Sequence, residues 1–185
     1  MDRFFKYTPD YNRYETVGLR KVEIGYCYQF EDGKPLAEKW ESPDVKIVAN
    51  RGKRGDFPGW DDSMPVFSPR ALQILTPLIG SSAEALPIRV EGTFPYYLIN
   101  VLDTIDCIDL EQSKHSFNEA AGIITWLTTR VAKSNVHIDK HMFRNRATPH
   151  LEIYVSDEFK SCVENNKLKG LLFKEVTKLP LHRPQ

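Results

Sequence analysis

The stretch that most constrains this chain runs from residue 56 to residue 80, DFPGWDDSMPVFSPRALQILTPLIG. Its first part is rich in turn formers, and its last part carries apolar residues at helical spacing. Ser68 is a good N-cap, because its hydroxyl can accept a hydrogen bond from an N–H of the first turn. Pro69 costs nothing there, since the amide it lacks would have no intrahelical partner. We therefore predict a helix that begins after Ser68, is disturbed at Pro77 and ends at Gly80.

A second serine-capped helix is predicted near the C-terminus. Ser156 precedes Asp157 and Glu158, and acids in the first turn are favoured by the positive end of the helix dipole. Most other segments alternate apolar and polar residues between turn formers, which is typical of strands. We expect strands over residues 19–30, 45–49, 86–91, 96–102, 122–131, 151–155 and 171–176, and another from Met142. A helix remains the alternative for residues 122–131.

These elements predict a single α+β domain, with a mainly antiparallel sheet of short strands and two main helices packed on it. The length of 185 residues fits one such domain. Residues 1–39 are interpreted as a strand-rich N-terminal extension of the same domain. The main domain covers residues 40–176, and residues 177–185 form a C-terminal tail.

The charge balance limits the kinds of partner. The chain has 25 Lys and Arg against 25 Asp and Glu, so it lacks the basic excess that binding to nucleic acid requires. No window approaches the ~18 apolar residues of a membrane span, and the N-terminus lacks the apolar core of a signal peptide. Three scattered cysteines without a CxxC spacing indicate reduced thiols. We therefore expect a cytoplasmic protein with no nucleic-acid or membrane partner.

The residues that carry common catalytic chemistry do not form a known pattern. His137 and His141 have the spacing of a zinc motif, but Ile138 stands where the motif requires its glutamate. The chain contains no GxSxG, no phosphate-binding glycine loop and no dinucleotide fingerprint. We expect no catalytic residues, no metal site and no cofactor.

The loop over residues 50–63 is the candidate binding surface. It combines charges of both signs with an aromatic residue: Arg51, Lys53, Arg54, Trp60, Asp61 and Asp62. Trp and Arg are frequent anchors of protein interfaces, and flanking charges set the orientation of a partner. The turn formers predict that the loop is exposed. Three alternatives remain open: Trp60 folds back onto the core, the cations form a flexible charged loop, and the acids cap their own turn.

The order of short motifs along the chain is more specific than any one of them. DFP at 56–58 is followed by VFS at 66–68, LP at 86–87, VSD at 155–157 and LKGLLF at 168–173. In this order the motifs resemble an immunity-protein family of bacterial polymorphic toxin systems, immunity family eleven. This family was formerly a domain of unknown function and is of a myxobacterial type. The resemblance covers residues 40–176, which it identifies as the immunity-protein domain.

The resemblance implies a cytoplasmic protein that binds a cognate toxin. Such a protein blocks the active site of the toxin, or its substrate, by stoichiometric protein–protein association. The family supplies no catalytic residue to carry over, so we expect no enzyme. Two other classes remain as alternatives: an interaction or regulatory module outside any toxin system, and a small enzyme.

Overall fold

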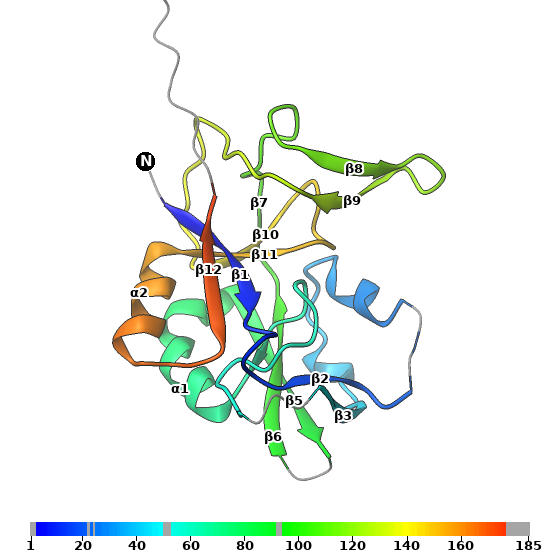
Figure 1. The fold of residues 1–185 in the computed structure, drawn as a ribbon, viewed down its shortest axis with the longest axis vertical. Coiled ribbons are helices and arrows are strands. Elements are labelled where there is room, and N and C mark those ends of the chain that lie inside the picture. The colour runs from blue at the N-terminus through cyan, green and yellow to red at the C-terminus, as the bar shows by residue number, and fades with distance from the viewer. Residues whose placement is uncertain (1–2, 22, 24, 50–52, 92–93, 177–185) are drawn as a thin grey trace, which may run out of the picture.

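The computed structural model describes residues 3–21, 23, 25–49, 53–91 and 94–176 (Figure 1). The predicted tail at 177–185 lies outside these residues. The first five-stranded sheet has the order β12 (Leu171–Glu175), β1 (Phe4–Pro9), β11 (Ile153–Ser156), β10 (Met142–Asn145), β7 (Thr104–Ile105). The second has the order β2 (Thr16–Leu19), β3 (Asp44–Ala49), β5 (Ala83–Val90), β6 (Phe94–Val101), β4 (Val66–Phe67). A separate two-stranded sheet consists of β8 (His115–Asn118) and β9 (Ile123–Leu127).

The helices complete an α+β fold in a single domain, as predicted. They are α1 (Pro69–Ile79) and α2 (Asp157–Asn165), with short 3₁₀ turns η1 (Tyr26–Phe30), η2 (Ala37–Lys39) and η3 (Gly80–Ser82). Among the described strands, only β7 with β10 and β3 with β5 pair in parallel. The mainly antiparallel character of the sheets is therefore confirmed.

Both predicted helix starts are confirmed. The Ser68 hydroxyl accepts a hydrogen bond from the Ala71 N–H, and the Ser156 hydroxyl accepts one from the Phe159 N–H, each at 3.1 Å. Helix α1 continues through Pro77 to its last residue and then tightens into η3. The two helices pack on each other and on strands of both sheets, so the segments on which the sequence prediction rested also cover the core.

The core beneath the helices is largely aromatic. Tyr7, Phe57, Phe67 and Phe159 are fully buried, and their rings contact one another in sequence. The shortest of these contacts joins Phe57 and Phe67, whose ring centroids lie 5.1 Å apart in an edge-to-face arrangement. Phe67 of β4, just before the helix cap, and Phe57 of the DFP turn therefore anchor the same cluster, which explains why the stretch at 56–80 organises the fold.

The predicted strand over residues 19–30 is wrong. Strand β2 ends at Leu19, and the segment from Tyr26 to Phe30 forms the 3₁₀ turn η1 after Gly25, whose φ is +82°. Its aromatic residues still reach a core, because Phe30 is buried and Tyr26 packs beside it. The turn thus directs Tyr26 and Phe30 to the core and leaves Tyr28 66% exposed.

The period-two pattern does not predict the first strand, β1. It lies between β12 and β11, so both of its edges are paired, and its two faces are buried in different core clusters, with Phe4 in one and Phe5 in the other. A strand buried on both faces does not alternate apolar with polar residues, and FFKYTP shows no such alternation. The period-two pattern that identifies half-exposed strands therefore misses it.

The strand prediction for residues 122–131 is confirmed for β9, but its setting differs from that of the other strands. The β8–β9 hairpin projects from the body at the upper right of Figure 1. Leu127 at its base is buried, but the large side chains farther out remain in solvent, with Phe117 and Trp126 each 56% exposed. This hairpin forms one wall of the site described next.

Candidate functional site

The six candidate residues fall into separate groups. Arg51 lies outside the described residues. Lys53 and Arg54 are exposed, and the Arg54 Nε lies 3.8 Å from the carboxylate of the buried Glu15. Trp60, Asp61 and Asp62 instead line a cleft to which neither cation contributes. The structure therefore brings the aromatic and acidic members together and places the two described cations elsewhere.

The turn that carries the acidic pair is held by its own side chains. The Asp61 Oδ1 accepts hydrogen bonds from the Ser63 N–H at 2.8 Å and from the Ser63 hydroxyl at 2.6 Å. The Met64 N–H donates to the Asp61 carbonyl oxygen. Asp61 therefore caps its own turn, which is one of the three alternatives for this loop. These hydrogen bonds fix the exposed Asp61 carboxylate at the tip of the turn.

Trp60 contacts both the core and the cleft. Its ring stacks on that of Tyr26, with centroids 6.1 Å apart and planes 3° from parallel. It packs at the edge of the core cluster of the second sheet, yet it remains partly exposed. The two alternatives for this residue are thus both present in part, since it folds back onto the core and still forms part of the cleft wall.

A buried charged network lies beneath the cleft. Lys6 of β1 places its Nζ 2.5 Å from Asp62 Oδ2 and 2.9 Å from Glu152 Oε1. Arg130 donates two hydrogen bonds to Glu152, and the Tyr154 hydroxyl donates another at 2.9 Å. The two positive charges of Lys6 and Arg130 balance the two negative charges of Asp62 and Glu152. Each group depends on the others, because a buried charge is costly unless it is paired.

Glu152 is the centre of this network, with its side chain only 3% exposed. Burial favours its neutral form, but the hydrogen bonds and charges of Arg130 and Lys6 outweigh burial and lower the pKa of Glu152 below its ordinary value. The carboxylate is therefore ionised at neutral pH and holds both cations in place. The network joins β1, the turn at 60–63 and the chain before β11.

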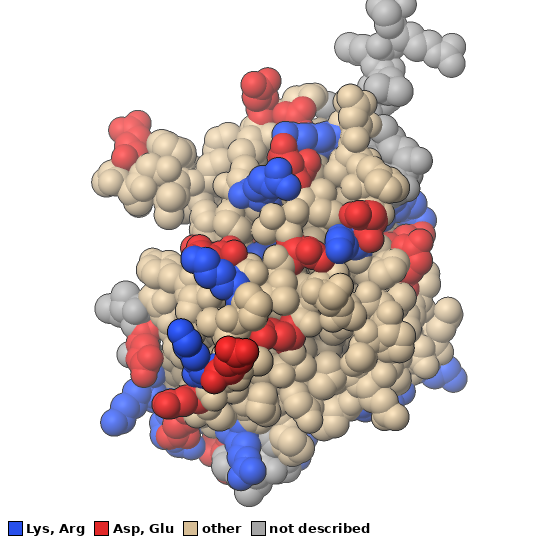
Figure 2. Space-filling model, turned by 180° about the vertical axis from the view of Figure 1, so that it is seen from behind, with Lys and Arg blue, Asp and Glu red and all other residues tan. Residues whose placement is uncertain are grey.

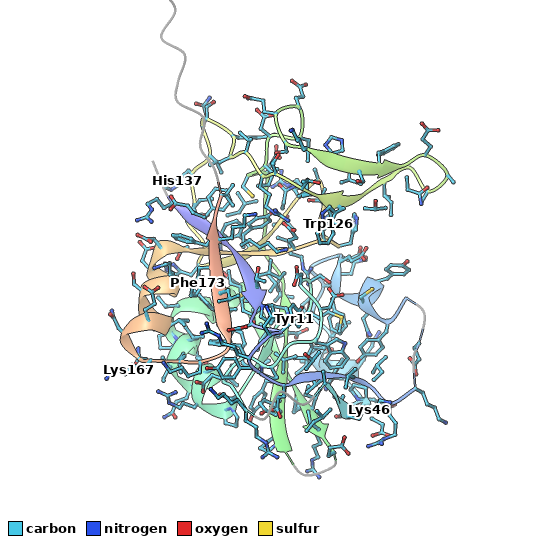
Figure 3. All side chains as sticks on the ribbon, in the orientation of Figure 1. Tyr11, Lys46, Trp126, His137, Lys167 and Phe173 are labelled. Carbon is cyan, nitrogen blue, oxygen red and sulfur yellow. The ribbon has the colours of Figure 1, made fainter. Side chains whose placement is uncertain are left out.

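The cleft lies between the hairpin and the body and has a volume of about 350 Å³. Its lining consists of Tyr11 and residues 60–62, 125–127 and 150–152. Figure 3 shows Trp126 on the side of β9 that faces the body. The Lys6 Nζ lies 5.8 Å from the centroid of the Trp126 ring, and the His150 Nε2 donates to the Ile124 carbonyl oxygen at 2.7 Å. These contacts fix the inner part of the hairpin against the body.

The apolar face of the hairpin extends outward from the cleft. Trp126 and Ile123 lie opposite Ser116 and Asn118 of β8, which share one face because side chains alternate along a strand. Phe117 lies opposite Ile124 and so belongs to the other face. The face of Trp126 therefore carries a short apolar strip, Trp126 and Ile123, which begins inside the cleft and ends in solvent, where Ile123 is 44% exposed.

Arg144 of β10 supports the turn at 60–63 from below. Its side chain is almost fully buried and donates to the carbonyl oxygens of Ser63 at 3.0 Å and Pro149 at 2.7 Å. A longer contact of 3.4 Å reaches the Val101 carbonyl oxygen of the second sheet. Burial lowers the pKa of Arg144 to about 10, so it remains charged at neutral pH. It fixes both the turn and the two sheets around one guanidinium.

One arrangement in the body combines a serine, a histidine and an acid, but it is a poor catalytic relay. The His141 Nδ1 lies 2.8 Å from the Ser156 Oγ and 3.9 Å from Glu158 Oε2. In a catalytic triad the acid and the serine contact opposite nitrogens of the imidazole. Here both approach the same nitrogen, and the Ser156 hydroxyl is also engaged as a helix cap.

The cysteines do not suggest nucleophilic chemistry either. Cys107 is buried, and burial raises the pKa of its thiol well above the ordinary value. Within the described residues, no group of three or more His, Cys, Asp and Glu side chains could hold a metal ion. None of the helices in this part of the chain has the length and apolar content needed to cross a membrane.

Charges of both signs are interleaved on the face shown in Figure 2. Ion pairs between partly exposed side chains of the protein include Lys133 with Asp106 at 2.5 Å and Lys140 with Asp103 at 3.2 Å. The mixed surface agrees with the balanced composition of the sequence, and the cleft stands out by its combination of aromatic and acidic groups rather than by charge alone.

Sequence reasoning found three residues of the cleft and missed the others. Lys6 carried a usable signal, since one lysine inside the aromatic run FFKY indicates a buried and paired charge. Trp126 carried none, because the sequence IITWL does not tell whether the apolar residues of a strand face a core or solvent. Glu152 and His150 reach the site through a turn whose position depends on the assembled sheets.

The chain matches the family described as "Immunity protein family (Imm11)" over residues 32–178. No curated protein matches it. The match covers most of the chain and includes the turn at 60–63, the hairpin and β11.

Proposed function

Because the chain belongs to the Imm11 immunity protein family, we propose that it binds a cognate toxin and neutralises it by stoichiometric association. The observation that carries this proposal is the exposed apolar strip of the hairpin beside the aromatic cleft. A tryptophan that is 56% exposed beside a second, partly exposed tryptophan is unusual for a surface without a partner. Tryptophan is among the residues that most often dominate the binding energy of protein interfaces.

The proposed contact surface is centred on the cleft and the strip. Trp60, Asp61 and Asp62 belong to it directly. Arg51, Lys53 and Arg54 remain in the proposal as charged neighbours in the same loop, which could set the orientation of the toxin. A stable complex should bury at least ~1,200 Å² in total, so the contact must extend beyond the cleft onto the outer part of the hairpin.

The proposed compartment is the cytoplasm. All three cysteines, Cys27, Cys107 and Cys162, are free thiols in the structure, which suits a reducing environment. Binding of the toxin requires no cofactor and no turnover.

The test uses the toxin encoded beside this gene. Increasing amounts of the protein are added to a fixed amount of toxin, and the residual toxin activity is measured. We expect a linear decrease that reaches full inhibition near one fixed molar ratio. Full protection at a small fraction of an equivalent would contradict the proposal, because it would require modification of the toxin or of its product.

The surface itself is tested with Trp126→Ser and a matched control, Leu172→Ser. Both residues are large, apolar and exposed, but Leu172 lies on β12, away from the hairpin. We expect Trp126→Ser to weaken the complex at least ~10-fold and Leu172→Ser to leave it unchanged. Equal effects of both substitutions, in variants with unchanged melting curves, would place the contact elsewhere.

A further inference from the structure

We propose that the cleft receives a cationic side chain of the toxin, an arginine or a lysine, held between Trp60 and Trp126. This inference rests on the proposed function for the source of the cation, but its chemistry can be tested without the toxin. Three features of the cleft carry it: the aromatic walls, the sign of the charge at the mouth and the available volume.

The aromatic walls already bind a cation of the protein itself. The Lys6 Nζ lies 5.8 Å from the centroid of the Trp126 ring, within the range of a cation–π contact. The ring remains more than half exposed, so part of its surface is open to a second cation. Trp60 also lines the cleft, and Tyr26 stacks on it and holds its plane.

The charges of the lining favour a cation. Three carboxylates line the cleft, those of Asp61, Asp62 and Glu152, and the lining contains no lysine or arginine. Two of these carboxylates are neutralised from below by Lys6 and Arg130. Asp61 forms no direct ion pair within the described part of the chain, where it accepts hydrogen bonds only from Ser63 and Met64. The buried Arg144 beneath the turn attracts Asp61 but also Glu31, so one guanidinium serves two carboxylates and negative charge remains in excess at the mouth.

The volume limits what can enter. At about 350 Å³ the cleft lies at the small end of the range for ligand pockets, ~300–1,000 Å³. One long side chain fits this space with its charged end near Asp61 and its alkyl part along the tryptophan rings. An arginine suits the site well, because its planar guanidinium stacks on aromatic rings and donates to carboxylates.

The experiment follows the indole N–H signals of the three tryptophans by NMR, with ¹⁵N-labelled protein. The probe is N-acetyl-arginine methylamide, and the control is N-acetyl-citrulline methylamide, which has nearly the same shape but no charge. Trp40 is an internal reference, because its indole N–H donates to the Pro87 carbonyl oxygen outside the cleft. We expect saturable shifts of the Trp60 and Trp126 signals with the arginine probe and at least 10-fold weaker binding of the citrulline probe.

A matched pair of substitutions tests the role of the charge. Asp61→Asn keeps the acceptor oxygen used by Ser63 and removes the charge. We expect this substitution to lower the affinity for the arginine probe about 3-fold. Glu158→Gln makes the same change on α2, on an exposed carboxylate away from the hairpin (Figure 1), and should leave binding unchanged. Equal binding of both probes, or shifts of Trp40 as large as those of Trp60 and Trp126, would overturn the inference.

The outcomes separate this inference from the proposed function. If the arginine probe binds as expected but the toxin is not neutralised, the cation site stands and the proposed function fails. If the toxin is neutralised stoichiometrically but Asp61→Asn leaves both the probe and the toxin complex unaffected, the proposed function stands and the cation site is wrong.

Discussion

The body of the protein and its β8–β9 hairpin use the same kinds of residue in opposite ways. In the body, the phenylalanines of the helix-covered core are buried and pack against one another. In the hairpin, Phe117 and Trp126 are both 56% exposed, and both strands are exposed over most of their length. Burial of apolar area stabilises the body, whereas the same area on the hairpin contributes little to folding and remains available to a partner.

The sharpest test of this comparison applies one substitution in both regions. Phe67→Ala removes a fully buried ring that contacts Phe57 and Phe159, and we expect it to lower the free energy of unfolding by about 3–5 kcal/mol. Phe117→Ala removes an equal ring from the hairpin and should change stability by less than ~0.5 kcal/mol. Urea unfolding measures both, and similar losses would show that the hairpin supports the fold.

The charged network beneath the cleft joins the two regions, and Glu152→Gln tests it. This substitution leaves Lys6 and Arg130 without their shared counter-ion, and we expect a loss of about 3 kcal/mol at pH 7. The folded state lowers the pKa of Glu152 below its ordinary value of 4.5. Its contribution is therefore fully present above pH 4.5 and is lost as the pH falls through the lower folded-state pKa.

Urea unfolding of the native protein and the Glu152→Gln variant, from pH 7 to below pH 4.5, measures how the stability contribution of Glu152 changes with pH. The difference in stability between them should be largest near pH 7 and should shrink on acidification below pH 4.5. A difference that grows toward low pH would mean that the neutral carboxyl group, rather than the carboxylate, is the stabilising form.

The smallest predicted effect concerns the two helix caps of the body. Ser68→Ala and Ser156→Ala each remove a hydroxyl that accepts from the first turn of a helix, at a cost of about 1 kcal/mol each. Differential scanning calorimetry should show lower midpoints for both variants. Toxin binding should not change, since neither hydroxyl lies in the cleft, and a loss of binding with an unchanged midpoint would contradict this division of roles.

Sequence reasoning succeeded where a local rule decides the structure. The caps at Ser68 and Ser156 are local, and the predicted strands over residues 86–91 and 96–102 correspond to β5 and β6, which pair with each other. It failed for β1, whose two edges pair with β11 and β12 from the far end of the chain and whose faces enter two separate core clusters. It also failed for residues 19–30, where β2 ends at Leu19 and Gly25, with its positive φ, begins a 3₁₀ turn.

The candidate site shows the same division. Trp60, Asp61 and Asp62 were found because they stand together in one turn. Their partners come from segments 51 residues before and 64 to 90 residues after this turn, since Tyr11 pairs with Asp62, and Trp126 and His150–Glu152 line the same cleft. Only the assembled sheets bring these segments together.

The irregular pairing of the hairpin has a consequence for self-association. Among the described strands, β9 pairs only with β8, so its outer edge is open to the strand of another copy. Between Ser116 and Phe117 the partner on β9 steps from Trp126 to Ile124, which leaves Thr125 as an extra residue. Such a bulge twists β9 and interrupts its regular row of amides and carbonyls. No more than two residues on either side of the bulge can then be matched in register. Because this break in the ladder disfavours the growth of intermolecular sheets, the protein can keep an apolar edge exposed in the absence of a partner.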